Sequence, residues 1–240
     1  MMICVFSYPD KPRRGDAIAV LSPSAPLPAR LPLPYELGLR RLREEFGLRP
    51  VEYPCTRALR ASPAERAADI HAAFADPQIK AVIASIGGDD QLKVLGHLDP
   101  SLLASHPKPF FGYSDNTNLH LFLWNLGLVS YLGGSVMVQF GWPVAMHAVG
   151  RRSLKAAMFG RETLRLDPPA SYCDENGRGC LRLLGAGACR ARRRLVRHEW
   201  FLVLELPSVP MARESYKAPP RPERLISNLC ASPYPVLRGS

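Results

Sequence analysis

The sequence lacks any run of the roughly 18 consecutive apolar residues that a transmembrane helix needs. Its first apolar residues are soon followed by Asp10, Lys11 and Arg13, which is the wrong order for a secretory signal peptide. The six cysteines are scattered without a CxxC pair, so neither a zinc site nor a disulfide framework is indicated. We therefore expect a cytoplasmic protein with free thiols, no metal and no membrane partner.

Acidic residues are also fewer than basic ones, and the formal net charge is +10. Such an excess would permit binding to nucleic acid, because clustered cations release counterions from phosphates. The densest run, Arg190–Arg197, contains no aromatic residue that could stack on bases. A solvated basic face, or a segment poorly matched to its fold, is the favoured interpretation, and we expect no nucleic-acid partner.

The chain has 240 residues, 47% of them hydrophobic, which is enough for a substantial core. Along it, strand patterns alternate with helix patterns. Short apolar runs predict buried strands, and helical spacing of apolar residues predicts helices between them. The predicted strands are 17–22, 48–53, 81–86 and 109–113, and the predicted helices are 35–46, 62–74, 91–98 and 116–126. This order predicts an α/β fold, a parallel sheet flanked by helices, with function at the carboxyl ends of the strands.

Local signals support several of these elements. Ser62, Pro63 and Glu65 form the pattern of a capping box with proline at the first helical position, which predicts a helix start. Gly47 stands where a left-handed residue ends the preceding helix. Pro50 cannot donate a hydrogen bond, so its strand is expected at a sheet edge or to begin near this residue.

Two of the predicted strands are followed by residues that are suited to catalysis or ligand binding. After the strand 81–86, Gly87 and Gly88 allow backbone N–H groups to face a cleft without side-chain obstruction. After the strand 109–113, Ser114 stands at a strand-to-helix turn, where its hydroxyl can be exposed and the helix N-terminus favours negative charge. The pair of ends predicts a serine nucleophile with an oxyanion hole formed by the N–H groups of Gly88 and Asp115.

Two other interpretations of these residues remain open at this stage. Serine and aspartate are ordinary helix N-cap residues, and Ser114 lacks the second glycine of the Gly-Xaa-Ser-Xaa-Gly elbow. The segment 87–90 could instead bind a phosphate or simply turn the chain.

Five segments between residues 15 and 137 carry a resemblance to a known family. They are, in chain order, Gly15-Asp16-Ala17-Ile18-Ala19-Val20, Arg66-Ala67-Ala68-Asp69-Ile70, Ile86-Gly87-Gly88-Asp89-Asp90, Gly112-Tyr113-Ser114-Asp115-Asn116-Thr117 and Gly133-Gly134-Ser135-Val136-Met137. The ordered series resembles the LD-carboxypeptidase family of serine peptidases, which includes the microcin C immunity hydrolases. An ordered series of this kind is far more specific than any one of its motifs.

The resemblance implies a Ser-Glu-His triad that hydrolyses amide bonds without metal or organic cofactor. Serine attacks the carbonyl carbon, histidine takes and returns the proton, and glutamate orients the histidine. By matching position, Ser114 is the nucleophile, and Gly88 and Asp115 supply the oxyanion N–H groups. The apolar run 200–205 matches the strand whose closing glutamate belongs to the triad, which makes Glu205 the candidate for that role.

The expected substrates are small: murein peptides cleaved between an L- and a D-centre, or acyl-sulfamoyl adenylates and related peptide-nucleotides. Gly87 and Asp89 are expected to contact them. Members of the family often form dimers, and the resemblance leaves a homodimer open for this chain.

The chain departs from the family pattern at the histidine. The family histidine lies well downstream of the glutamate, whereas no histidine follows Glu205 and the last one, His198, precedes it. His120 lies six residues after Ser114, on a different face of the predicted helix, and is expected to be structural. The alternative function is therefore a catalytically inactive family member that at most binds a peptide or an acyl-nucleotide.

The second half of the chain matches the family poorly. We expect an N-terminal α/β domain at 1–150 that carries the nucleophile, a divergent linker region at 151–195, and a truncated remnant of the C-terminal domain at 196–240. Several prolines in residues 210–235 discourage regular structure there. The C-terminal domain is thus expected to be shortened and irregular.

Overall fold

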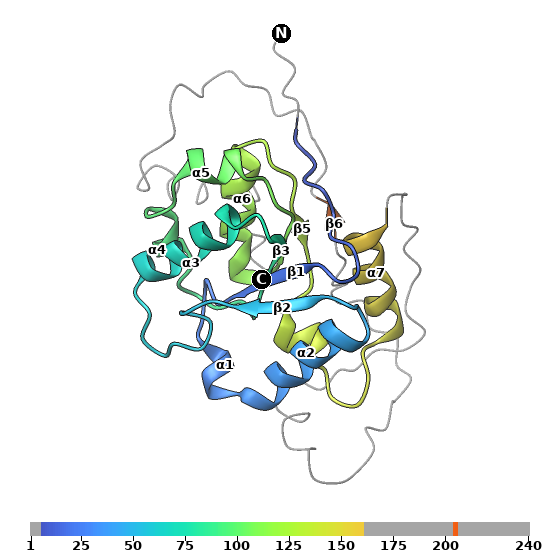
Figure 1. The fold of residues 1–240 in the computed structure, drawn as a ribbon. Helices are drawn as coiled ribbons and strands as arrows, with labels where there is room; N and C mark the ends of the chain where they lie inside the picture. The colour runs from blue at the N-terminus through green and yellow to red at the C-terminus, as the bar shows by residue number, and fades with distance from the viewer. Residues whose placement is uncertain (1–5, 161–203, 206–240) are drawn as a thin grey trace, which may run out of the picture. The chain divides into compact units, whose positions relative to one another are not determined.

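A mixed β-sheet forms the centre of the computed structural model, which describes residues 6–160 and 204–205. In this part of the chain the strands are β1 (Ala17–Leu21), β2 (Arg49–Glu52), β3 (Ile79–Ala84), β4 (Phe110–Gly112), β5 (Tyr131–Leu132) and β6 (Leu204–Glu205). Their order across the sheet is β2-β1-β3-β4-β5-β6 (Figure 1). The first five run parallel, and β6 is antiparallel to β5.

Helices connect the parallel strands. They are α1 (Leu27–Arg30), α2 (Pro32–Glu44), α3 (Pro63–Ala75), α4 (Leu92–Leu95), α5 (Pro100–Ser105), α6 (Thr117–Asn125) and α7 (Ala148–Phe159), with a 3₁₀ turn η1 (Ser114–Asn116) and a π-helical turn η2 (Val136–Phe140). None of the helices in the described ranges is long and apolar enough to cross a lipid bilayer.

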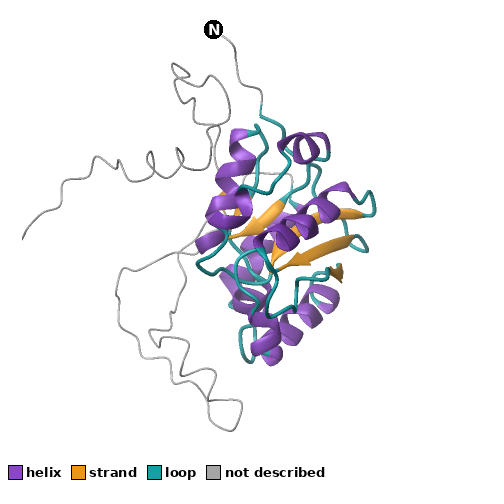
Figure 2. Ribbon diagram, turned by 90° about the vertical axis from the view of Figure 1, so that its left-hand side faces the viewer, coloured by secondary structure: helices purple, strands orange, loops and turns teal. Residues whose placement is uncertain are grey.

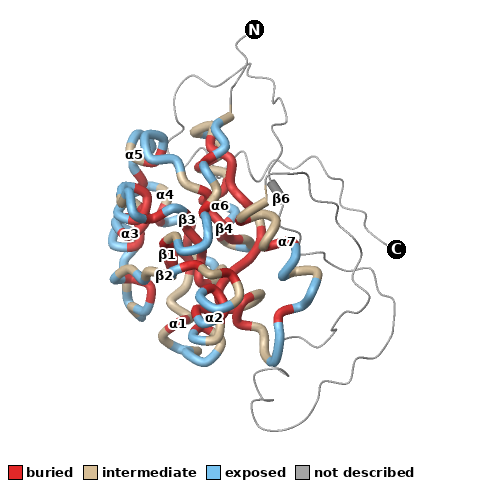
Figure 3. The backbone as a smooth tube through the Cα atoms, turned by 45° about the vertical axis from the view of Figure 1, so that its right-hand side comes forward, coloured by how far each residue is buried: buried red, intermediate tan, exposed pale blue. Residues whose placement is uncertain are grey.

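The sheet separates two apolar cores because successive side chains of a strand point to opposite faces. Ala17, Ala19 and Leu21 of β1 pack with α3, α4, α5 and α6. Ile18 and Val20 pack with α2, η2 and α7. Helices therefore cover both faces (Figure 2), and buried residues follow the strands and the inner sides of the helices (Figure 3). The α/β class predicted from the sequence is confirmed.

The predicted local signals are confirmed as well. The Ser62 hydroxyl accepts from the Glu65 N–H, and the Glu65 carboxylate accepts from the Ser62 N–H, so α3 begins with a complete capping box. Gly47 has φ +67° just after α2. The strand that contains Pro50, β2, lies at the edge of the sheet.

The strand order places a switch point between β1 and β3. The chain passes from β1 outward to β2 and then returns to β3 on the other side of β1. Connections that leave two adjacent strands in opposite directions open a crevice at their carboxyl ends, where α/β proteins bind ligands. Segments 22–26 and 85–91, which follow β1 and β3, therefore both lie at the carboxyl edge of the sheet.

Helix α7 was not predicted, and the expected domain boundary at residue 150 falls within it. Leu154 and Met158 of α7 are buried against α2 and the sheet, so the described core continues past residue 150. The expected linker and remnant lie almost wholly outside the described residues, and those divisions stay predictions.

Candidate active site

Ser114 has a backbone conformation that few non-glycine residues adopt. It follows β4 by two residues and has φ +62°, in the left-handed region, and its side chain is exposed. That conformation costs about 1–2 kcal/mol in an L-residue. The N-cap of η1 is Tyr113 and that of α6 is Asn116, so Ser114 does not serve as a helix N-cap. A strained serine exposed between strand and helix is typical of a nucleophile elbow.

This strain makes a prediction about stability. Ser114→Gly is expected to raise the free energy of unfolding by about 1 kcal/mol relative to Ser114→Ala, because glycine adopts positive φ without steric cost. Ala72, exposed on α3, provides the matched control, since Ala72→Gly should lower the same quantity by about 1 kcal/mol. Urea denaturation of the three variants measures both effects. Equal stabilities of the glycine and alanine variants at position 114 would contradict the strained conformation.

The glycine segment after β3 packs directly against Ser114. A Cβ atom built on Gly87 would lie 3.0 Å from Ser114 Cβ and 3.2 Å from Ser114 Oγ. A Cβ on Gly88 would lie 2.9 Å from the Cβ of Ala25, in the segment that follows β1. The missing side chains therefore permit close approach of three segments that follow neighbouring strands. Both glycines were predicted site residues, and the structure brings them to Ser114 and to the segment after β1, respectively.

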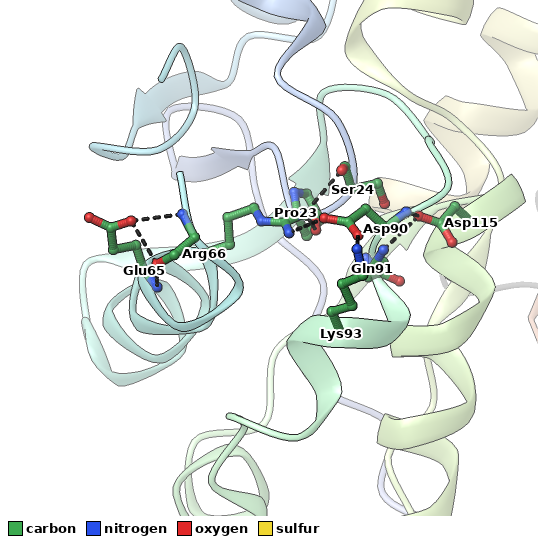
Figure 4. Close-up of polar contacts among 9 residues, drawn as sticks. Pro23, Ser24, Glu65, Arg66, Asp90, Gln91, Lys93 and Asp115 are labelled. Carbon is green, nitrogen blue, oxygen red and sulfur yellow. Dashed lines mark hydrogen bonds and ion pairs between the residues drawn. The ribbon is translucent and has the colours of Figure 1, made fainter. Parts of the chain in front are cut away.

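Asp115 connects the elbow to the segment after β3 through its side chain. Its carboxylate accepts hydrogen bonds from the backbone N–H groups of Asp90, at 3.1 Å, and Gln91, at 2.9 Å (Figure 4). Asn118 Nδ2 donates to the same carboxylate from α6. The side chain of Asp115 thus fixes the position of the loop that carries Gly87 and Gly88.

Asn116 is a positioning residue that the sequence analysis missed. Its side chain is fully buried, and Oδ1 accepts from Gln91 Nε2 at 2.9 Å and from Ser24 Oγ at 3.3 Å. Its Nδ2 donates to the carbonyls of Ile86 and Tyr113. One amide therefore ties together the segments after β1, β3 and β4. It stands two residues after Ser114 in the motif 112–117, which was the only signal for it.

Arg66 of α3 fastens the same segments from the other side (Figure 4). Its Nη1 donates to the carbonyls of Pro23 and Ser24, both at 3.0 Å, and its Nη2 contacts Asp90 Oδ2 at 2.6 Å. Lys93 also pairs with Asp90, and the two cations, with that of Lys93 the stronger influence, lower the pKa of the Asp90 carboxyl. Asp90 is therefore held ionised between them.

His120 is the buried histidine nearest in sequence to Ser114, and both of its ring nitrogens are engaged. Nε2 lies 2.9 Å from the Gly112 carbonyl, which can only accept, so Nε2 carries the proton. Nδ1 lies 2.7 Å from Ser130 Oγ and accepts from it. Burial lowers the pKa of His120 to about 4. The ring is thus a neutral support between β4 and β5, as the sequence predicted.

The depressed pKa of His120 predicts a dependence of stability on pH. The unfolded chain, with a histidine pKa near 6.5, binds the proton more readily than the folded protein does, so stability is fully present above pH 6.5 and falls as the pH drops toward 4. The two pKa values correspond to about 3 kcal/mol at most. Urea denaturation between pH 7 and 4 should show this loss in the native chain and a smaller one in His120→Gln. Parallel curves for the two proteins would contradict the buried neutral ring.

The other described histidines are His71, His97, His106 and His147. His71 Nε2 accepts from the Asp99 N–H, and His106 Nδ1 contacts the Leu102 carbonyl. Within the described residues, no hydrogen bond joins any histidine to Ser114. His198 lies outside those residues, so the structure does not assign the proton acceptor.

Glu205 is described only by its backbone. It pairs with Tyr131, while Leu204 pairs with Leu132, which in turn pairs with Gly112. Strand β6 is antiparallel to β5, and β5 is parallel to β4. From Leu204 to Glu205 the chain therefore runs away from the sheet edge at which Ser114 follows β4. Leu204 and Glu205 thus add a short strand to this sheet, and the role of Glu205 as the orienting carboxylate stays a prediction.

A glycine segment and a strained serine thus follow the adjacent parallel strands β3 and β4 at their carboxyl ends. A family model described as the LD-carboxypeptidase N-terminal domain matches residues 18–133. These residues belong to the LD-carboxypeptidase family. The LD-carboxypeptidase domain of this chain thus includes Gly87, Gly88, Ser114 and Asp115, and the resemblance seen in the sequence is confirmed.

Individual relatives agree with the family assignment. The domain is similar to the "Probable murein peptide carboxypeptidase" of Bacillus subtilis, with 35% identity over 149 residues that cover 57% of this chain and 44% of the relative. An MccF-like protein from Bacillus anthracis shares 30% identity and a TM-score of 0.59, over 63% of this chain and 47% of the other. The microcin self-immunity protein MccF in complex with aspartyl sulfamoyl adenosine shares the fold, with TM-score 0.65 and 24% identity over 70% and 52% of the two chains.

The chain spans about half the length of these relatives.

Proposed function

We propose that this chain is an LD-carboxypeptidase-like serine hydrolase in which Ser114 is the nucleophile. The observation that carries the proposal is the conformation of Ser114: φ +62°, an exposed side chain, and Gly87 packed against its Oγ. A structural serine at a helix start would gain nothing from this strain, whereas a nucleophile gains access to a substrate carbonyl. Membership of residues 18–133 in the family supports the same role.

In this proposal the N–H groups of Gly88 and Asp115 stabilise the oxyanion that forms when Ser114 Oγ attacks a carbonyl carbon. The N–H of the residue after the nucleophile is the usual first donor in such elbows, and a glycine segment of a neighbouring loop supplies the second. The bonds from Asp90 and Gln91 to the Asp115 carboxylate support this assignment, because they hold the glycine segment beside the elbow before substrate arrives. Glu205 would orient the histidine that takes the proton from Ser114.

The proposed substrates are small molecules with an amide bond, either murein peptides or peptide-nucleotides of the microcin type. The name of the Bacillus subtilis relative refers to murein peptides, and MccF forms a complex with aspartyl sulfamoyl adenosine. Gly87, beside Ser114, and the exposed Asp89 would contact such a substrate. Both classes are compatible with action in the cytoplasm, which we propose as the location.

Labelling with a fluorescent fluorophosphonate tests the proposal, because this reagent phosphonylates activated serines. The native chain should be labelled, and Ser114→Ala should not. Ser101→Ala is the matched control: Ser101 is exposed on α5, and its removal should leave labelling unchanged. Absence of labelling in the native chain, together with no cleavage of an L,D-peptide, would show an inactive family member instead.

A further inference from the structure

A cleft of about 560 Å³ lies at the carboxyl ends of β1, β2 and β3. Its lining includes Ser22 and Ser24 from the segment after β1, Cys55 after β2, and Asp89 and Asp90 after β3. This is the switch point of the sheet, where ligands of α/β proteins bind. We call it the switch-point cleft. It adjoins the proposed oxyanion segment, because Ser24 and the neighbouring residue 25 pack against Gly88.

One part of the lining is formed by small or aliphatic side chains. These residues are Ala25, Pro26, Leu27, Ala58, Leu59 and Ala61. Leu59 exposes 54% of its surface, and covering this apolar surface with a ligand would be favourable. The volume and this wall suit a ligand with short apolar groups, of the size of a dipeptide rather than of a single ion.

Some of the charged residues that line the cleft form ion pairs with one another, and others do not. Asp90 is paired with both Arg66 and Lys93, so these three charges largely satisfy one another. Arg30, at the end of α1, and Asp89 are both exposed, and the side chain of neither has an ion pair or hydrogen bond within the described ranges. The cleft thus offers one cation and one carboxylate to a ligand.

Arg66 also lines the cleft, but its guanidinium is engaged by the protein. Its side chain is only 6% exposed, and its Nη atoms bind the carbonyls of Pro23 and Ser24 and the carboxylate of Asp90. The cleft therefore combines an apolar wall with one free charge of each sign, those of Arg30 and Asp89.

We propose that the switch-point cleft binds a short zwitterionic peptide. Arg30 binds its free carboxylate, Asp89 binds its free ammonium group, and the side chains lie against the apolar wall. That the bound peptide is a substrate of Ser114 rests on the proposed function. That the cleft binds a peptide rests on the cleft alone.

Calorimetric titration of the full chain carrying Ser114→Ala tests binding without turnover. The probes are L-alanyl-L-alanine, its C-terminal amide and its N-acetyl derivative, which differ only in the two terminal charges. The dipeptide should bind best, and each derivative should bind about tenfold more weakly, because each loses one charge-assisted contact. Equal affinity of all three, or no binding of the dipeptide at millimolar concentration, would overturn the proposal.

Two further variants assign the contacts. In the Ser114→Ala background, Arg30→Gln should weaken binding of the dipeptide about tenfold and leave binding of its amide unchanged. Asp89→Asn should likewise weaken binding of the dipeptide about tenfold, and it should leave binding of the N-acetyl derivative unchanged. Arg40→Gln, which removes an exposed cation on α2 outside the cleft, is the matched control and should change nothing. Equal weakening of every probe by Arg30→Gln would overturn the assigned contacts.

The two proposals fail separately. Selective dipeptide binding without fluorophosphonate labelling of the native chain would leave the cleft as a peptide site in an inactive protein. Labelling at Ser114 without charge-selective dipeptide binding would retain the hydrolase and overturn the cleft proposal.

Discussion

Gly87→Ala is expected to slow fluorophosphonate labelling of Ser114 by about 100-fold, comparable to the loss of an oxyanion-hole donor. The added Cβ would lie 3.0 Å from Ser114 Cβ and 3.2 Å from its Oγ, closer than most Cβ contacts. It would displace the serine from its strained position and occupy the space that a substrate carbonyl needs. The measurement is the second-order rate constant of labelling, taken at a temperature where circular dichroism shows a folded chain.

Gly150→Ala is the matched control for this variant. Gly150 lies within α7, and a Cβ there meets no atom within 4 Å. Its labelling rate should equal that of the native chain, and its stability should rise by about 1 kcal/mol because alanine is the better helix former. A Gly87→Ala protein that is labelled at the native rate would show that the close packing of Gly87 and Ser114 has no part in reactivity.

Asn116→Leu is expected to lower the free energy of unfolding by about 3 kcal/mol, with a large loss of labelling. Leucine has nearly the same size, but it cannot bond to Gln91, Ser24 or the two carbonyls that the amide satisfies. Buried groups left without partners each cost about 1–3 kcal/mol, and the costs are not fully additive. Urea denaturation measures the stability, and the labelling rate reports on the geometry of the elbow.

The control for this substitution is Asn125→Leu, at the exposed end of α6. It makes the same chemical change where no buried group depends on the amide, so its stability should stay within about 0.5 kcal/mol of the native chain. If Asn116→Leu were as mild as Asn125→Leu, the buried amide would not be what holds the three segments together.

The fold was predictable wherever local signals and tertiary packing agree. Helix α3 has its capping box and an apolar stripe, and Ala67, Ile70, Ala73 and Phe74 are buried as its spacing predicts. Strands β1 and β3 are short apolar runs, which a sheet covered on both faces requires. In these segments each local preference favours the same structure that the whole fold imposes.

The turn η2 was missed because distant residues stabilise it. Arg41 of α2 is buried and donates to the carbonyls of Phe140 and Trp142 at 2.7 and 2.6 Å. Gly38 allows α2 to lie against Val136, since a Cβ there would come within 2.2 Å of the Val136 carbonyl oxygen. Residues 136–140 have neither a helical hydrophobic periodicity nor a capping residue that would indicate these contacts, so sequence patterns could not predict a π-helical turn.

The site divides in the same way. Ser114, Gly87 and Gly88 could be identified from their places after predicted strands, and the structure packs Gly87 against Ser114 and Gly88 against the segment after β1. The residues that hold them, Arg66 and Asn116, act through contacts between segments that are far apart in sequence. Spacing alone carries no signal for such contacts, although both residues stand in segments that resemble the family.

Peptide mass spectrometry after fluorophosphonate treatment tests the central claim most directly. The native chain is labelled, digested and fragmented, and the modified residue is located in the spectrum. A single adduct on Ser114 is the predicted result, with none on control serines such as Ser101. An adduct on another serine while Ser114 stays unmodified, or no adduct at all, would contradict the role of Ser114 as nucleophile.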